Sequence, residues 1–169
     1  YLEVPLDSET KQDFQKYLDE AYDEEAGYYE RIRGILTNFD DYQYELGFDD
    51  SVGIQKLRRF ITEIKSGDCT EFSNTAALLG RMAGIPSRVV TGYLASKDLQ
   101  SMAHQWGIQE LRKSIPQLQE YPFNNIYLVT TAHHHSWVQY YLPQYGWVDF
   151  ETTSYAIPPP PGGDPNAKN

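Results

Sequence analysis

Hydrophobic positions early in the chain recur at intervals of three and four residues, the spacing of one face of an α-helix. Two glycines, Gly27 and Gly34, fall inside this stretch, and glycine weakens a helix through its backbone freedom. The pattern therefore predicts helical structure over residues 8–38 without predicting one unbroken helix. The positions that carry the stripe are Phe14, Tyr17, Leu18, Ala21, Ile32, Ile35 and Leu36.

Two more helices are predicted after a loop at 40–50. The first is a short amphipathic helix marked by Ile54, Leu57, Phe60, Ile61 and Ile64. Ser66-Gly67 ends it, because glycine suits the left-handed position after a helix. The second begins near Cys69 and carries Phe72, Ala76, Leu79 and Ala83 on one face. Gly84 closes this helix and Pro86 prevents its continuation.

The period then changes, and four runs rich in β-branched and aromatic residues predict strands. Tyr145-Gly146 separates the last two and predicts a hairpin turn. Residues 96–125 have weaker periodicity and predict a long excursion, a kind of loop that is often functional when a compact domain retains it. Helices followed by an antiparallel sheet predict an α+β domain. The runs are 88–95, 126–131, 136–142 and 147–152.

Length and composition indicate one domain followed by a tail. The 169 residues can bury a substantial core without disulfides, and Cys69 is the single cysteine. We expect the domain at 1–157, with a helical extension over about 1–39 and a core over about 40–157. Residues 158–169 begin with four prolines and predict an extended linker or tail.

The charge of −10 is concentrated in residues 1–50, which hold 15 acidic and 4 basic side chains. This balance argues against nucleic acid or an anionic membrane surface as a partner. The acidic pairs Asp40-Asp41 and Asp49-Asp50 lack the ligand spacing of a calcium loop, so we interpret the acidic region as a solvated helical face. No run is long enough to insert into a membrane, no signal peptide is visible, and the start at Tyr1 predicts a fragment of a longer protein.

Cys69 is the first candidate for chemistry. A cysteine in the first turn of a helix faces unpaired backbone N–H groups and the positive end of the helix dipole, which favour thiolate over thiol. The same groups can stabilise an oxyanion if the sulfur attacks a carbonyl. A buried structural cysteine is the alternative, and position alone leaves both open.

A run of three histidines and two later carboxylates offer a base and its partner. On a strand His133 and His135 point one way and His134 the other, so the three cannot all bind one metal, and no second cysteine supports a zinc site. One of the three could be the base that takes the thiol proton, and we interpret His133 and His134 by default as ordinary polar surface. Asp149 and Glu151 lie two apart on a predicted strand and share a face, so either could orient an imidazole or be a solvated carboxylate.

Taken in order, these segments resemble the transglutaminase-like core, a branch of the papain-like cysteine enzymes. The resemblance covers roughly residues 40–155 and includes Tyr42-x-Tyr44. Its main motifs are Gly67-Asp68-Cys69, Gly84-Ile85-Pro86-Ser87-Arg88, Gly92-Tyr93, His135-Ser136-Trp137-Val138 and Gly146-Trp147-Val148-Asp149-Phe150-Glu151-Thr152-Thr153.

The resemblance implies one residue for each catalytic role. Cys69 matches the nucleophile, and His135 matches the base because it stands two residues before Trp137. Glu151, four residues after Trp147, takes the place of the acid, where the family usually has Asp followed by Pro. Asp149 is out of register. The resemblance also implies that Trp137 and Tyr93, with Arg88, form part of the site wall, and that Trp137 or Trp106 could donate to an oxyanion, although packing is the simpler role for both tryptophans.

The function implied is acyl transfer through a Cys69 thioester on glutamine-type amides or peptide bonds, with protein or peptide substrates and no cofactor or metal. A non-catalytic binding or scaffolding module is the alternative, and a zinc-dependent hydrolase is a third hypothesis. Similar bacterial domains are often the exported part of larger membrane-anchored proteins, so we expect an extracytoplasmic location.

Overall fold

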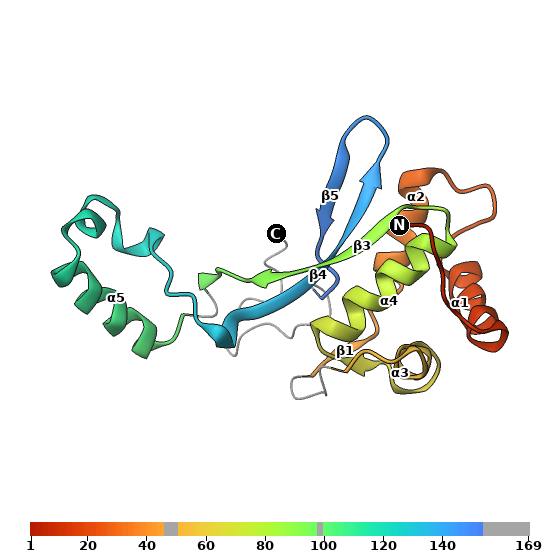
Figure 1. Ribbon diagram of the computed structural model, residues 1–169, viewed down its shortest axis with the longest axis horizontal. Helices are drawn as coiled ribbons and strands as arrows, with labels where there is room; N and C mark the ends of the chain where they lie inside the picture. The colour runs from red at the N-terminus through yellow and green to blue at the C-terminus, as the bar shows by residue number, and fades with distance from the viewer. Residues whose placement is uncertain (46–50, 98–99, 154–169) are drawn as a thin grey trace. The chain divides into compact units, whose positions relative to one another are not determined.

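The computed structural model describes residues 1–45, 51–97 and 100–153, which form two compact units. The main unit comprises residues 1–90 together with the described residues from Ser136 onward, and the second unit comprises residues 91–135. Figure 1 shows the elements of both. The expected tail at 158–169 and the pair Asp49-Asp50 lie outside the described residues.

The helical segment predicted over 8–38 forms two helices, α1 (Ser8–Ala21) and α2 (Tyr28–Thr37). Asp7 caps α1 by accepting the Thr10 N–H at 2.8 Å. The buried Tyr17 hydroxyl ties the two helices together by donating to the carbonyl of Ile35 at 3.0 Å. The helical stripe is therefore confirmed, with its break just before Gly27.

The next helix ends differently from the prediction. After α3 (Ile54–Arg59) the chain continues as a π-helical turn over Phe60–Ile64. Its left-handed residue is Lys65, with φ of 50°, and not Gly67. Ser66–Gly67 instead forms β2, which pairs in parallel with β1 (Gln43–Tyr44). Strand β1 lies inside the loop predicted at 40–50. The backbone of β2 is thus used in pairing, which a local pattern does not reveal.

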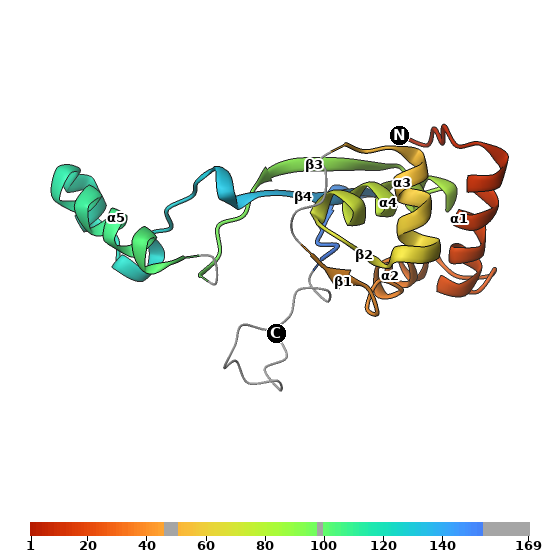
Figure 2. The same ribbon diagram turned by 90° about the horizontal axis from the view of Figure 1, so that it is seen from below.

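Helix α4 (Cys69–Met82) is the centre of the main unit. It contacts α1, α2 and α3, and Figure 2 shows it lying beside β3. Its buried Phe72 ring meets Phe60 and Phe39 with ring centroids 5.0 and 5.5 Å apart. Gly84, with φ of +76°, follows the helix as predicted.

The sheet has the order β3–β4–β5, formed by Ser87–Tyr93, His134–Leu142 and Gly146–Phe150. The antiparallel hairpin of β4 and β5 sets Tyr140 opposite Val148. Gln144 and Gly146 adopt positive φ in its turn. The inner face of β4 packs on α4, and the buried Tyr140 hydroxyl donates to the carbonyl of Ala76 at 2.9 Å. Helices packed on an antiparallel sheet confirm the predicted α+β class.

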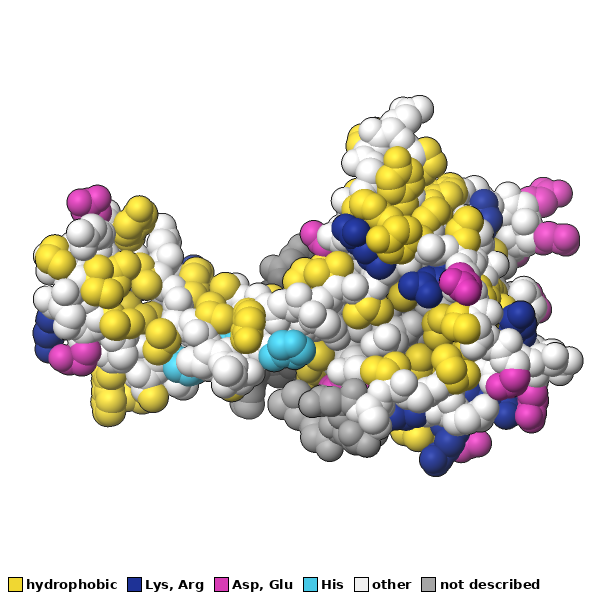
Figure 3. All heavy atoms as spheres, viewed as in Figure 1, with side chains coloured by type: hydrophobic (Ala, Val, Ile, Leu, Met, Phe, Trp, Pro, Cys, Tyr) yellow, Lys and Arg dark blue, Asp and Glu magenta, His cyan; other side chains and the backbone are white. Residues whose placement is uncertain are grey.

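The second unit contains α5 (Met102–Ser114) and 3-10 segments at Pro116–Glu120, Phe123–Asn125 and Thr131–His133. The sequence does not predict α5, because its hydrophobic residues form no regular buried stripe: Ile108 is its buried residue, while Trp106 is 63% exposed. Figure 3 shows many hydrophobic side chains on the surface of the second unit. The strand predicted at 126–131 is wrong: the N–H of Leu128 there donates to the side chain of Gln100, at 2.9 Å.

Within residues 1–45, 51–97 and 100–153, no helix combines the length and apolar character needed to cross a bilayer.

Candidate active site

Cys69 is the first residue of α4, and a network of charged side chains caps the helix there. Asp68 accepts the N–H of Thr70 at 2.8 Å and also that of Glu71. Glu71 reaches back to the N–H of Asp68 at 2.9 Å and forms an ion pair with Lys56 at 2.5 Å. This reciprocal arrangement is a capping box, which fixes the backbone on both sides of Cys69.

The capping box corrects the expectation that Cys69 faces unpaired N–H groups. Asp68 uses the N–H groups of Thr70 and Glu71, so these donors are not available to the Cys69 sulfur. The carboxylate of Asp68 also offsets part of the positive helix end. The N–H of Cys69 itself remains outside the capping box.

The phenol of Tyr44 takes that remaining N–H. Its hydroxyl is hydrogen-bonded to both the backbone N–H and the side chain of Cys69. Burial, followed by the nearby Cys69 and Asp68, raises the pKa of Tyr44 to about 12. The phenol therefore keeps its proton at neutral pH, and it stands at the two atoms of Cys69 that acyl transfer would use.

Strand β4 is bound directly to the same helix start. The Ser136 hydroxyl donates to the carbonyl of Cys69 at 2.9 Å. The Ser73 hydroxyl is hydrogen-bonded to the same Ser136 hydroxyl, also at 2.9 Å. Ser136 is buried, as is His135, which directly precedes it at the end of the second unit. The residue after the proposed base is thus anchored to the backbone of the proposed nucleophile.

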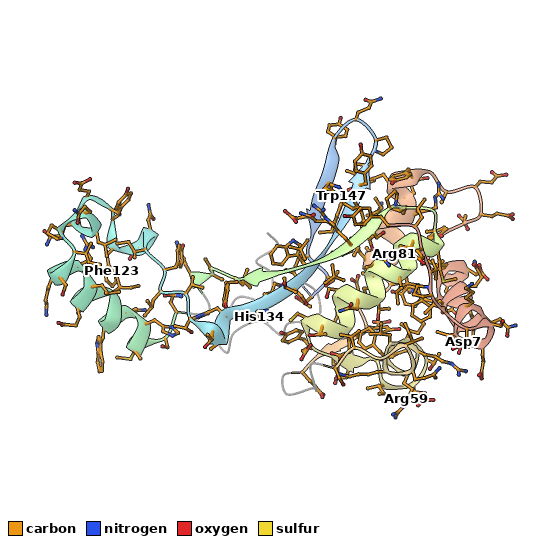
Figure 4. The ribbon with its side chains drawn as sticks, in the orientation of Figure 1. Asp7, Arg59, Arg81, Phe123, His134 and Trp147 are labelled. Carbon is orange, nitrogen blue, oxygen red and sulfur yellow. The ribbon has the colours of Figure 1, made fainter. Side chains whose placement is uncertain are left out.

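The other two histidines of the run, His133 and His134, have environments different from each other. His133 belongs to a 3-10 turn rather than to the strand. It is buried, and its Nδ1 accepts the N–H of Thr130 at 2.8 Å, which corrects the expectation of polar surface and of a strand face shared with His135. His134, labelled in Figure 4, is exposed on β4, as expected. Its ring and that of Tyr93 meet edge to face, with centroids 5.9 Å apart.

The two carboxylates differ equally clearly. Asp149 accepts from the indole N–H of Trp137 at 2.5 Å and from the amide of Gln139 at 2.7 Å. Glu151 lies one residue beyond β5, so the two do not share a strand face as expected. One oxygen of Glu151 accepts from the N–H and the hydroxyl of Thr153, at 2.9 and 2.6 Å.

The aromatic residues proposed for the site wall are placed as follows. The indole N–H of Trp137 is used by Asp149. Tyr93 is largely exposed beside His134. Arg88 donates to Gln139 at 2.7 Å and lies 4.3 Å from the Trp147 ring. Trp106 is exposed on α5, so the packing role expected for it is wrong.

Four residues of this region escaped the sequence analysis: Tyr44 in its contact with Cys69, Ser136, and the capping pair Asp68 and Glu71. The capping pair has a local signal, an N-cap residue followed three positions later by Glu. The contacts of Tyr44 and Ser136 arise from strand placement and have no local signal. Across residues 1–45, 51–97 and 100–153, no group of three His, Cys, Asp or Glu side chains is arranged to hold a metal ion.

Two curated bacterial proteins are similar in sequence. A Bacillus subtilis protein, YebA, described as uncharacterized, is 37% identical over 95 residues, which are 56% of this chain and 10% of YebA. A protein-glutamine gamma-glutamyltransferase of Pseudomonas aeruginosa is 30% identical over 121 residues, which are 72% of this chain and 15% of that protein. The chain therefore spans a small part of the length of these relatives.

Two solved structures share the fold. Both are crystal structures of the periplasmic domain of TgpA from Pseudomonas aeruginosa, one of them bound to ethylmercury, and both have a TM-score of 0.65. Their identities are 24% and 22%, and each match covers 91% of this chain and 47% or 46% of the TgpA domain.

The family model described as the transglutaminase-like superfamily matches residues 16–152, which include every element of the main unit from α2 to β5. With the capped Cys69 helix, the order of the motifs and the shared fold, this match shows that the chain belongs to the transglutaminase-like superfamily.

Proposed function

We propose that this chain is a thiol-dependent acyltransferase or hydrolase in which Cys69, His135 and Glu151 are nucleophile, base and orienting acid. The observation that carries the proposal is the hydrogen bond from Ser136 to the carbonyl of Cys69. It anchors the strand residue that follows His135 to the first residue of α4. Superfamily membership supports the same reaction class.

The charges around Cys69 assign a specific task to His135. Asp68 and Glu71 put two carboxylates into the cap of the helix turn that begins with Cys69, and Glu71 is paired with Lys56. Because Asp68 occupies the helix N–H groups, the dipole gives the thiolate limited help. The positive partner of the thiolate is therefore the imidazolium of His135, which forms when His135 takes the thiol proton.

The reaction then runs through a thioester. The Cys69 sulfur attacks an amide carbonyl, the C–S bond forms and the carbonyl electrons move to oxygen. The oxyanion collapses, the C–N bond breaks and the amine leaves with the proton from His135. A second amine gives transamidation and water gives hydrolysis. The relative named protein-glutamine gamma-glutamyltransferase supports a glutamine side chain in a protein or peptide as acyl donor, and the periplasmic TgpA domain supports an extracytoplasmic location.

Alkylation against pH tests the thiolate–imidazolium pair. At about pH 6, where an ordinary thiol is barely ionised, we expect iodoacetamide to label the wild-type protein and not Cys69→Ala. His135→Ala should move labelling to the pH range of an ordinary thiol and lower the rate of acyl-enzyme formation by at least about 100-fold.

His134→Ala is the matched control, because His134 is the adjacent histidine and is exposed. It should leave both rates unchanged. Equal loss in the two histidine variants would contradict the assignment of the base. Wild-type protein that alkylates only as an ordinary thiol, and accepts no acyl donor, would favour the binding-module alternative.

A further inference from the structure

Tyr44 is held beside Cys69 by the backbone on both sides of it. Tyr44 pairs with Gly67 in the parallel β1–β2 ladder. The N–H groups of the residues before and after it donate to the carbonyls of Lys65 and Gly67, both at 2.9 Å. Its ring packs against the buried Phe72, with centroids 6.5 Å apart. The phenol is therefore fixed by three separate contacts before any substrate arrives.

The position of the hydroxyl is unusual for a tyrosine that only packs. The neighbouring Tyr42, which is buried whereas Tyr44 is half-buried, donates to the carbonyl of Ile61 at 3.2 Å. Tyr44 is instead hydrogen-bonded to the N–H of Cys69 and to its side chain. An acyl carbonyl attacked by the sulfur must place its oxygen near this N–H, which is the donor that the capping box leaves to Cys69.

We propose that Tyr44 is a catalytic residue that supplies the second oxyanion hydrogen bond, the first coming from the N–H of Cys69. This inference rests on the proposed function. In the resting site the phenol oxygen accepts from that N–H. When the substrate carbonyl enters, its oxygen takes over the N–H, and the phenol turns its own O–H toward the same oxygen.

The step balances without a co-reactant. As the C–S bond forms, the carbonyl π electrons become a lone pair on oxygen, and the Tyr44 O–H and the Cys69 N–H both donate to it. As the C–N bond breaks, the oxygen returns to a carbonyl and the amine leaves with the proton from His135. Tyr44 keeps its proton throughout, in agreement with a pKa of about 12. Trp137 is a weaker choice for this donor, since its indole N–H is used by Asp149.

Two reactions of the Cys69 sulfur distinguish oxyanion donation by Tyr44 from an effect of Tyr44 on the nucleophilicity of the thiol. Acylation by p-nitrophenyl acetate forms an oxyanion, whereas alkylation by iodoacetamide attacks a saturated carbon and forms none. Tyr44→Phe keeps the ring against Phe72 and removes only the hydroxyl. We expect it to lower the acylation rate by roughly 100- to 1000-fold, the usual cost of one oxyanion donor. The plateau rate of alkylation at high pH should stay at the wild-type value.

Tyr42→Phe is the matched control, because it removes a buried phenol two residues away that does not reach Cys69. It should acylate at the wild-type rate. If Tyr44→Phe acylates as fast as wild type or faster, or if acylation and plateau alkylation fall together, Tyr44 is not an oxyanion donor. If the wild-type protein forms no acyl-enzyme on Cys69, the proposed function itself fails, and this inference with it.

Discussion

Two carboxylates at the end of the hairpin differ in what binds them. The Asp149 side chain is exposed on the hairpin, and one of its oxygens accepts hydrogen bonds from both Trp137 and Gln139. Glu151 accepts from Thr153 through one oxygen just beyond β5. Asp149 thus has structural partners in Trp137 and Gln139, whereas Glu151 is the residue that we propose as the acid.

Charge removal at these positions separates the two roles. We expect Glu151→Gln to lower the acylation rate by about 100-fold or more, because the imidazolium of His135 loses the carboxylate that stabilises it. Asp149→Asn should keep most of the activity, since it removes one charge from the outer face. Glu151→Asp should retain activity, because it restores the residue usual in the family.

The measurement is the rate of acyl-enzyme formation and of Cys69 alkylation against pH for all three variants. If Asp149→Asn abolishes low-pH alkylation while Glu151→Gln keeps it, the acid is Asp149 and the motif register is wrong.

At the scale of elements, the close approach of α2 to the end of α1 involves a glycine. A Cβ built on Gly34 would lie 2.3 Å from the backbone carbonyl oxygen of Ala21. That oxygen cannot move without shifting the end of α1. The position therefore needs glycine for close approach, although it lies inside a helix where glycine is intrinsically unfavourable.

Gly34→Ala should lower the free energy of unfolding by about 1–3 kcal/mol, the usual cost of overpacking, despite the better helix propensity of alanine. Gly53→Ala is the control, because a Cβ there meets nothing within 4 Å. It should change stability by less than about 1 kcal/mol. Urea denaturation of the two variants and the wild type measures this, and a Gly34→Ala protein as stable as wild type would show that α1 and α2 separate at little cost.

Sequence pattern predicted the elements that carry a signal along their own length. The helices α1 to α4 carry hydrophobic residues at helical spacing, and the strands β3 to β5 are runs of β-branched and aromatic residues, so period and residue type found them. The pair β1 and β2 has two residues in each strand and depends on a partner more than twenty positions away. Helix α5 buries Ile108, which is too little for a stripe.

The same limit applies to the site. Cys69, His135 and Glu151 stand in linear motifs, and the spacing of those motifs is visible in the sequence. Tyr44 reaches Cys69 because the β1–β2 ladder brings it there, and Ser136 because β4 packs on α4. The carboxylate of Asp68, which accepts the N–H groups of Thr70 and Glu71, changes the electrostatics around the thiol. This capping box has a local sequence signal, but it overlaps the motif Gly67-Asp68-Cys69.

At the scale of the whole molecule, three buried tyrosines join the layers of the main unit. Tyr17 of α1 donates to a carbonyl of α2, Tyr42 to the π-helical turn, and Tyr140 of β4 to α4. Burial raises the pKa of each phenol above its ordinary value of 10. A phenolate could neither donate these hydrogen bonds nor be solvated in the core.

These shifts predict alkaline unfolding. In the unfolded chain the three phenols ionise near pH 10, whereas in the folded chain they stay protonated to higher pH. The unfolded state therefore binds fewer protons above pH 10. Stability is intact below that pH and falls as the pH rises toward the folded values, by about 1.4 kcal/mol per pH unit for each tyrosine.

Comparing wild type with Tyr140→Phe isolates one of these phenols from the lysines that titrate in the same range. At pH 9 the variant should be less stable by roughly 1 kcal/mol, because the Ala76 carbonyl loses its donor. Between pH 9 and 11 it should lose less stability than wild type, so that the two denaturation midpoints converge. Tyr145→Phe, at an 81% exposed position, should follow wild type throughout. Parallel pH profiles for wild type and Tyr140→Phe would mean that Tyr140 ionises equally easily in the folded and unfolded protein, and that its burial does not couple stability to pH.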